Sequence, residues 1–447
     1  MNKKKLFLIL LIFFSIDLLA ISFFVFRYIK DRSDTEKKEN DRGQTESSKL
    51  AVPIPSGLIG PEDFIYKGAF RLPQEALSEA RSWSWGGSAA TYYPKGDPSG
   101  ESDSYPGSIF ATGNDIYQYI AEFSIPVPII SEAKDVSELN TAQMLQDFTD
   151  IRGNMFGELE LPRVGLEYLP KQGSQDSDKL YYTWGQHLQE YDEGVSHGWF
   201  DLDLSQPNVQ GPWSVSERIK YEITDYIFTI PDNWADEYLN GMKLATGRFR
   251  DGGQGAQGPS IIAYAPWLDD SLPEESSELS NTPLLLYSSV YEDPGAEYAL
   301  ENYHHSDMWS GGAWITTSDK SAVIIAGIKG KGDCWYGYQD GTVWPEEGPF
   351  PDEGVGERGW WSDDFASQIL FYDTADLAKV ANGEMESYEP QPYAVMEFDE
   401  VFFNIPEDEL WFLGAASYDR ENNILYIFEY RGDSENDGPI VHVWKIG

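Results

Sequence analysis

The chain has 447 residues, enough for a large hydrophobic core, and carries a formal net charge of −43. A charge of this sign and size repels nucleic acids and anionic lipids, so we exclude a nucleic-acid-binding protein. Aromatic residues make up 15% of the chain, which excludes an acidic disordered protein, because such proteins contain few aromatics.

The N-terminus has the pattern of a membrane anchor. After the basic residues 1–5 comes Leu6–Phe26, an almost entirely apolar run. As an α-helix this run would be about 31 Å long, which matches the hydrocarbon core of a bilayer. A cleaved signal peptide is the alternative, but its apolar region is usually shorter, at about 7–15 residues. We therefore predict a single-pass signal anchor (residues 6–26) in the cell membrane, with the acidic body extracytoplasmic.

The segment after the anchor differs from the rest of the chain. Residues 31–59 are polar and charged and then proline-rich, with too few apolar side chains to build a core. They predict a disordered stalk. Residues 60–447 are predicted to form a single all-β domain.

Short apolar runs recur along this domain in pairs separated by a polar turn, a pattern typical of antiparallel hairpins. In chain order, the pairs are Ser88–Tyr93 with Ser108–Thr112, Gly165–Leu169 with Lys179–Trp184, Ala313–Thr317 with Ala322–Ala326, and Leu413–Tyr418 with Ile424–Phe428. A third run follows each pair, at Tyr119–Ile125, Phe200–Leu204, Gln368–Tyr372 and Val441–Ile446.

The stretches between these units are less regular. Ile129–Asp150 has helical spacing and predicts a short helix that begins near Ser137. Residues 226–264 predict three further strands and a short helix at Asp232–Leu239. A glycine- and proline-rich insertion, Gly330–Gly359, separates the third hairpin from its third strand.

The recurrence of three- to four-stranded units favours a β-propeller of about five blades, because radial packing protects the edges of such sheets. The early run Tyr66–Leu72 is expected to close the ring by joining the last sheet. A pair of β-sandwiches or an irregular barrel is the alternative, since no strict motif recurs at a fixed period.

A histidine cluster is the first candidate site. His304 and His305 are followed closely by Asp307, and imidazole and carboxylate groups can bind one divalent metal ion or act as a base with its orienting acid. His187 follows a strand of the second unit and is expected on the same face of a propeller. The alternative is that these are hydrogen-bonded loop histidines packed among aromatics.

An arginine pair is the second candidate site. Arg248 and Arg250 precede a glycine-rich loop in a chain with few basic residues, and guanidinium groups bind carboxylates and phosphates. The loop has neither a Walker spacing nor a GxGxxG between strand and helix, so nucleotide binding is not indicated. The alternative is a wide loop whose arginines pair with nearby acids.

Three weaker signals complete the set. Acidic loops at residues 97–103 and 346–353 offer oxygen ligands suited to calcium but lack the EF-hand spacing, and solvated loops are the alternative. The single cysteine, Cys334, excludes an intrachain disulfide and would be a nucleophile only beside a base. Loop tryptophans, Trp309 among them, suit a sugar-binding surface but equally suit packing between sheets.

Several runs carry a resemblance to known sequences. They are YPGSIFATGND, GLEYLPKQGSQDSDKLYYTWGQH, LATGRFRDGGQGAQGPS, YHHSDMWSGGAW and KGKGDCWYG. These runs resemble those of a group of exported or membrane-anchored prokaryotic proteins with propeller-like repeats, over most of residues 64–447. The resemblance implies no established activity and therefore carries over no catalytic residue. Sialidase boxes and the WD signature are absent from the sequence, so those propeller families are not indicated.

Three functions follow from these patterns. The first is a membrane-anchored ligand-binding propeller for a glycan or another cell-envelope component. The second is a metal-assisted hydrolase or lyase that uses the histidine cluster in a funnel site, with Arg248 or Arg250 holding an anionic group. The third is a module for protein–protein assembly.

Overall fold

The computed structural model describes residues 54–447, apart from residues 75–77, 98–103, 154, 158, 160–161, 187–191, 249–256, 268–270, 288–297, 346, 352–355, 357 and 405–412. The predicted anchor Leu6–Phe26, most of the predicted stalk, His187 and Arg250 lie outside the described residues. Among the residues described, no helix has the length and apolar character needed to cross a membrane.

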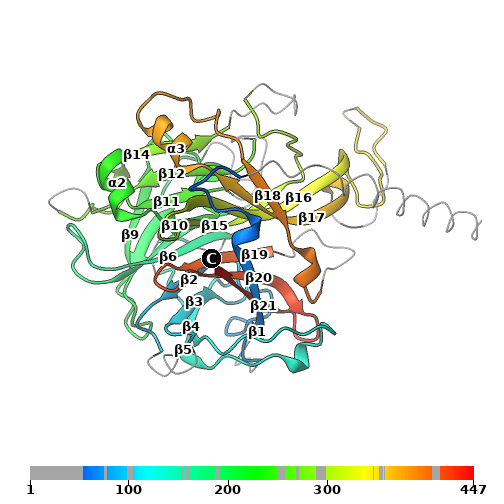
Figure 1. The fold of residues 1–447 in the computed structure, drawn as a ribbon, viewed down its shortest axis with the longest axis horizontal. Helices are drawn as coiled ribbons and strands as arrows, with labels where there is room; N and C mark the ends of the chain where they lie inside the picture. The colour runs from blue at the N-terminus through cyan, green and yellow to red at the C-terminus, as the bar shows by residue number, and fades with distance from the viewer. Residues whose placement is uncertain are drawn as a thin grey trace, which may run out of the picture. The chain divides into compact units, whose positions relative to one another are not determined.

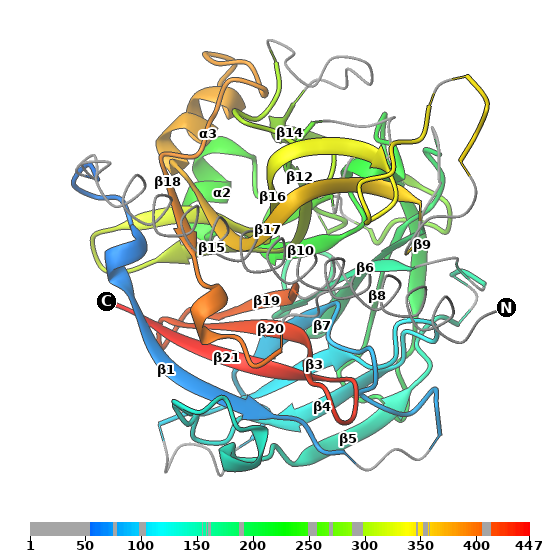
Figure 2. The same cartoon turned by 90° about the vertical axis from the view of Figure 1, so that its right-hand side faces the viewer.

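The strands of the described residues form five sheets, and Figure 2 shows them arranged around a common axis. Blade 1 contains β2 (Ala90–Tyr93), β3 (Ser108–Thr112), β4 (Ile120–Ser124) and β5 (Met144–Thr149). Blade 2 contains β6 (Arg163–Leu169), β7 (Lys179–Gly185), β8 (His197–Phe200) and β9 (Gln210–Val215), with β13 (Glu278–Leu279) parallel at its edge. Blade 3 contains β10 (Tyr226–Thr229), β11 (Leu244–Gly247), β12 (Ser260–Tyr264) and β14 (Asn281–Leu286).

Blades 4 and 5 contain the longest strands (Figure 1). Blade 4 contains β15 (Met308–Thr316), β16 (Ser321–Gly337), β17 (Gly359–Tyr372) and β18 (Ala394–Glu397). Blade 5 contains β19 (Leu413–Asp419), β20 (Ile424–Asp433), β21 (Gly438–Ile446) and β1 (Phe64–Arg71). In the described part of the chain, two short α-helices join strands, α2 (Asp232–Tyr238) between β10 and β11 and α3 (Thr374–Ala381) between β17 and β18.

The first strands of the five blades form the inner ring. β2 packs against β6, β6 against β10, β10 against β15, β15 against β19, and β19 against β2 again. This closed circuit defines a five-bladed β-propeller, and the predicted propeller is confirmed over the sandwich and barrel alternatives.

Burial explains why the inner and middle strands read as continuous apolar runs. Every residue of β3 is buried, because both faces of the sheet are covered by neighbouring blades. Phe70, Tyr92, Phe123 and Phe428 belong to one such core between blades 1 and 5. In β18, at the outer edge, half-buried and exposed residues alternate instead.

The ring closes through the strand nearest the N-terminus. β1 pairs with β21 from Phe64 opposite Ile446 to Arg71 opposite Ile440, as Tyr66–Leu72 predicts (Figure 2). On its other edge, Ala69 exchanges two backbone hydrogen bonds of 2.9 Å with Ile129 from blade 1. Both edges of β1 are therefore engaged, which removes an exposed sheet edge at the closure.

A buried polar network ties this closure together. His442 Nε2 is hydrogen-bonded to Glu429 Oε2 at 2.8 Å, and both side chains are fully buried in blade 5. The hydroxyl of Tyr66 on β1 lies 3.0 Å from His442 Nδ1. Glu429 also accepts the backbone N–H groups of Phe403 (2.8 Å) and Asn404 (2.6 Å). His442 is thus a structural residue at the junction between the first and last strands.

The structure corrects three details of the sequence prediction. Residues 129–150 contain no α-helix but a 3-10 turn at Val136–Glu138 followed by the strand β5, which pairs with β4. The third strand of blade 2 is His197–Phe200 rather than Phe200–Leu204, because Thr183 pairs with His197. The insertion at Gly330–Gly359 is partly regular, since β16 and β17 extend into it as a ladder. The helix predicted at Asp232–Leu239 is confirmed as α2.

Candidate functional site

A pocket lies where the inner strands of all five blades begin. Its empty volume, which includes space open to solvent, is about 540 Å³. We call it the mouth pocket, and its lining consists of Ser88, Asp115, Pro162, Arg163, Val164, Asp225, Met308, Ser310, Ile328, Leu413, Gly414 and Tyr430. The pocket therefore sits at one end of the central channel of the propeller, with every blade contributing.

Below the mouth pocket the channel narrows, because the residues that line it are small and allow the inner strands to approach one another closely. A second, smaller space of about 180 Å³ is lined by Ala89, Gly165, Gly311 and Ala415, among others. A Cβ added to Gly311 would lie only 2.7 Å from the Cβ of Ala416 on the neighbouring inner strand. The inner strands thus approach too closely at this level for larger side chains.

Two charged side chains bridge the far end of the channel. Arg420 of blade 5 donates to the carbonyl oxygens of Trp314 (3.0 Å) and Thr229 (3.1 Å) in blades 4 and 3. Glu167 of blade 2 accepts the hydroxyl of Thr91 in blade 1 (3.0 Å) and the backbone N–H of Thr229 (3.0 Å). These contacts link all five blades at the end opposite the mouth pocket.

The polar groups of the mouth pocket are held in defined positions. The Tyr430 hydroxyl lies 3.1 Å from Asp115 Oδ2 and 3.0 Å from the carbonyl oxygen of Trp85. Burial raises the pKa of the Asp115 carboxyl, while the Tyr430 hydrogen bond and the charge of Arg163 oppose that rise. Asp225 is 7% exposed, and its backbone N–H is bonded to Gly247. The pocket therefore combines carboxylates, a guanidinium and hydroxyls with apolar walls.

A strained tryptophan lies beside the pocket. Trp85 has a φ of 58°, a left-handed conformation that is unusual for a bulky residue. Its backbone N–H donates to the Asp437 carbonyl at 2.8 Å, and the Arg431 guanidinium lies 3.9 Å above its ring. Arg431 is fixed in turn by two hydrogen bonds to Asp437 Oδ1, of 2.8 and 3.0 Å. These contacts hold Trp85 in its left-handed conformation beside the pocket.

The predicted histidine cluster lies next to the mouth pocket, since Met308 lines it and directly follows Asp307. Asp307 is buried, and its carboxylate accepts the Lys329 ammonium (2.9 Å), the Gly330 N–H (2.9 Å) and the His304 N–H (3.0 Å). Burial raises the pKa of Asp307, and the charge of Lys329 opposes the rise. This carboxylate is therefore engaged in holding its own loop against β16.

The two histidines point to different partners. His304 Nδ1 lies 3.1 Å from Ser362 Oγ, and burial, together with the charge of Lys329, lowers the pKa of His304 to about 4. His305 stacks on Trp360 with ring centroids 4.3 Å apart. Within the described ranges, no group of three or more His, Cys, Asp or Glu side chains is placed to hold a metal ion. In this structure His304, His305 and Asp307 thus form a packed loop and not one ligand set.

A chain of hydroxyl groups next to His304 resembles a nucleophile and its base but is covered. Ser306 Oγ and Ser362 Oγ are 2.7 Å apart, and Cys334 Sγ lies 3.8 Å from Ser306 Oγ. A Cβ at Gly330 would lie 2.3 and 2.5 Å from the two hydroxyl oxygens. The backbone of β16 therefore packs directly on these groups and leaves no room for a substrate carbonyl.

Two other predicted ligand-binding residues, Arg248 and Trp309, do not line the mouth pocket. Arg248 is fully buried, and its charge opposes the rise in the pKa of Glu222 that burial causes. Trp309 is 1% exposed and packs in the core between blades 3 and 4. His187 and Arg250 lie outside the described residues.

Sequence reasoning missed the polar residues of the mouth pocket. Asp115, Arg163 and Asp225 come from three blades, and each lies in a separate part of the chain. Their shared signal is position, because Arg163 begins an inner strand and Asp225 immediately precedes one. A survey of polar residues at the starts of the predicted inner strands finds both.

No protein-family model matches the chain, and no curated protein matches it. Among solved structures, the chain is similar to one described as "Humanized mutant of the Chaetomium thermophilum Polycomb Repressive Complex 2 bound to the inhibitor GSK343". The two share 8% sequence identity with a TM-score of 0.31, over 86% of this chain and 97% of that chain. A TM-score this low does not establish a shared fold. The five sheets themselves define the class, a five-bladed β-propeller, a fold that typically serves as a binding platform.

Proposed function

We propose that the protein is a ligand-binding propeller whose mouth pocket receives part of a glycan or another cell-envelope component. The observation that carries this proposal is the convergence of five blades on one pocket with mixed chemistry. Ligand sites are typically concave and largely apolar, with a few polar groups that fix orientation. The mouth pocket has this composition, and it lies beside the strained Trp85.

A sugar ring suits such a pocket because it presents hydroxyls at its edge and C–H groups on its faces. Asp115, Arg163 and Tyr430 supply acceptors and donors, and Val164 and Leu413 supply apolar contacts. The predicted signal anchor and extracytoplasmic position would place the pocket near cell-envelope glycans. The hydrolase alternative has less support, because Gly330 covers the hydroxyls beside His304.

The test compares two aspartate variants of the full-length, detergent-solubilised chain. Asp115→Asn removes a charge from the mouth pocket, and we expect about tenfold or greater loss of affinity for a bound glycan, because a hydrogen bond to a charged group is lost. Asp147→Asn is the matched control, since Asp147 pairs with Arg81 on the exposed surface. Binding is measured by calorimetry with neutral mono- and oligosaccharides identified on a glycan array. Equal affinities for wild type and Asp115→Asn would contradict the proposal.

A further inference from the structure

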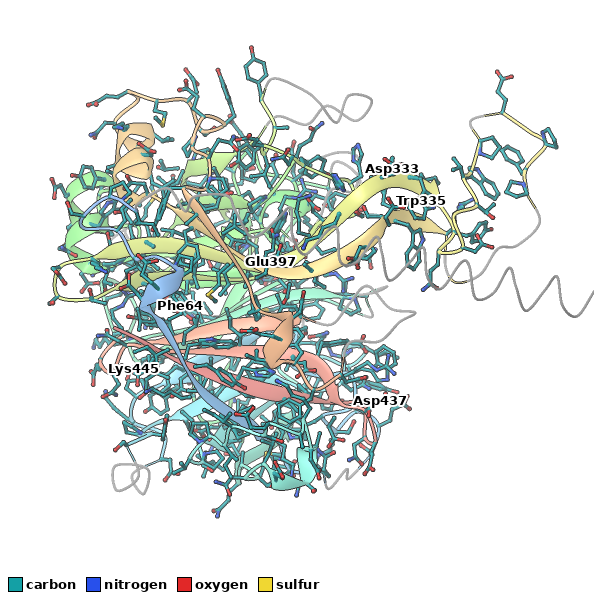
Figure 3. All side chains as sticks on the ribbon, turned by 45° about the vertical axis from the view of Figure 1, so that its right-hand side comes forward. Phe64, Asp333, Trp335, Glu397, Asp437 and Lys445 are labelled. Carbon is teal, nitrogen blue, oxygen red and sulfur yellow. The ribbon has the colours of Figure 1, made fainter. Side chains whose placement is uncertain are left out.

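The β16–β17 hairpin extends beyond its own blade. Ile328 pairs with Met308 at the start of β15, but β16 continues to Gly337 and remains paired with β17 as far as Gly359. Since Ile328 and Met308 line the mouth pocket, the extension rises from the rim of that pocket. Figure 1 shows this hairpin projecting from the body, and Figure 3 shows Asp333 and Trp335 on the projecting part.

A continuous series of ring contacts starts at the base of the hairpin. Tyr303 contacts His305 edge to face at 5.3 Å, and His305 stacks on Trp360 at 4.3 Å. Trp360 then contacts Tyr336 at 5.4 Å across the two strands. His305, which the sequence predicts as a metal ligand or a base, thus packs against the aromatic side chains at the base of the hairpin.

The series continues outward through a cation. The Arg358 guanidinium lies 5.9 Å from the Tyr336 ring and 4.4 Å from the Trp344 ring, and Trp344 stacks on Phe350 at 4.9 Å with an interplanar angle of 11°. Phe350 is 56% exposed although its ring is aligned by this stack. Stacking orders these side chains before any partner binds, which reduces the entropy lost on binding.

The charge around these rings limits the class of ligand that the surface can bind. On the described part of the hairpin, the exposed ionisable side chains around these rings are five acids and one arginine: Asp333, Asp340, Glu347, Asp363, Asp364 and Arg358. Arg358 is engaged by Tyr336 and Trp344, so the surface offers carboxylate acceptors beside aromatic faces. An anionic chain would be repelled, whereas a neutral sugar stacks its C–H face on a ring and donates hydroxyls to carboxylates.

We propose that Tyr336, Trp344, Phe350, Arg358 and Trp360, which we call the hairpin platform, bind a neutral oligosaccharide chain whose end enters the mouth pocket. This inference rests on the proposed function and adds to it the ligand class and a second contact region. The pocket holds the terminal unit, and the hairpin platform holds the units that follow.

The experiment measures how affinity depends on chain length. Full-length wild type and Trp344→Ala/Phe350→Ala are titrated with hexasaccharides of N-acetylglucosamine and of glucose, with the matching monosaccharides, and with an anionic uronic-acid hexamer. We expect the wild type to bind a neutral hexamer about tenfold or more tightly than its monomer, and the double variant to lose that gain. Tyr298→Ala is the matched control, because Tyr298 is also exposed (39%) and stacks on Tyr388 at 4.5 Å.

The outcomes separate this inference from the proposed function. If Asp115→Asn weakens monomer and hexamer alike while the hairpin variant binds the hexamer normally, the hairpin inference is overturned and the pocket stands. Loss of hexamer binding in the hairpin variant alone supports the platform and overturns the pocket. Equal binding of the anionic hexamer, or no binding of either neutral hexamer, overturns the inference. Phe350→Ala alone replaces the double variant if thermal unfolding shows the latter to be destabilised.

Discussion

Glu167 and Arg420 illustrate how single residues connect the blades. Both lie at the far end of the channel. Together they bond to backbone or hydroxyl groups on the three remaining inner strands, β2, β10 and β15. The surrounding strands desolvate the Glu167 carboxyl and raise its pKa to about 7, despite hydrogen bonds from Thr229 and Thr91. Its protonation state therefore changes near neutral pH.

This shift predicts a pH-dependent stability. The carboxyl has a raised pKa in the folded state, so its contribution is fully present below the ordinary value of 4.5 and is lost as pH rises through about 7. Relative to Glu167→Gln, the wild type should lose about 1–3 kcal/mol of unfolding free energy over that window. Urea unfolding of both proteins from pH 4 to pH 8 measures the difference. Glu397→Gln, at an exposed pair with Lys331, serves as control, and parallel pH profiles for wild type and Glu167→Gln would refute the assignment.

For single residues, the sequence could suggest which side chains form a site but not which groups they are bonded to. The His304, His305 and Asp307 pattern predicts a ligand set, yet Asp307 is already bonded to Lys329 and Gly330, which come from β16. Proximity of this kind depends on the sheet register, and a single sequence does not reveal that register. The mouth pocket is harder still to foresee, because its charged residues come from different blades.

Among the elements, the inner and middle strands were predictable and most outer strands were not. The inner and middle strands are buried on both faces, so their sequences are nearly unbroken apolar runs. β18 lies at an edge and alternates in burial, and β9 and β14 contain Pro212 and Pro283, which weaken a strand signal. The predicted helix at 129–150 failed for a similar reason, since β5 is an outer strand with alternating burial.

Within the strand β1, ring closure depends on one glycine, Gly68. Gly68 has a φ of 112° at a bulge opposite β21, and an added Cβ would lie 2.4 Å from the Ile129 carbonyl carbon. A side chain there would push apart the two edges that β1 joins.

We therefore expect Gly68→Ala to destabilise the protein strongly, by about 3 kcal/mol or more, through backbone strain and steric overlap together. Gly383→Ala isolates the strain, because Gly383 has a φ of 71° with no atom within 4 Å of an added Cβ. This control should cost about 1–2 kcal/mol. Denaturant unfolding of both variants is the measurement, and similar losses for the two would show that the contact with Ile129 is not restrictive.

For the whole molecule, the charge is as important as the fold. The chain contains 75 acidic and 32 basic residues, and an excess of this size works against the compact state by self-repulsion. Blade number and ring closure followed from the recurrence of hairpins and from the early strand, whereas the projecting part of β16 and β17 was expected as an irregular insertion. Its many glycines and prolines are typical of a loop, and the strand ladder within it is evident only from the pairing of β16 with β17.

The excess charge predicts that salt stabilises the protein. The midpoint of thermal unfolding should rise by several degrees between about 10 and 150 mM NaCl, where the screening length falls from about 30 to 8 Å. Choline chloride should act equally well if screening is the cause. A midpoint that rises with calcium chloride but not with either monovalent salt would point instead to specific cation sites in the acidic loops.

Ring closure by β1 also sets the order of events during synthesis. Tyr66 and His442, which meet across the closure, are 376 positions apart in the chain. At about 5–20 residues per second, the ribosome needs roughly 20–75 s to make the partner of a strand that has already emerged. Until then β1 has no β21 to pair with, and blade 5 is incomplete. A nascent chain therefore cannot close the ring before β21 has been made.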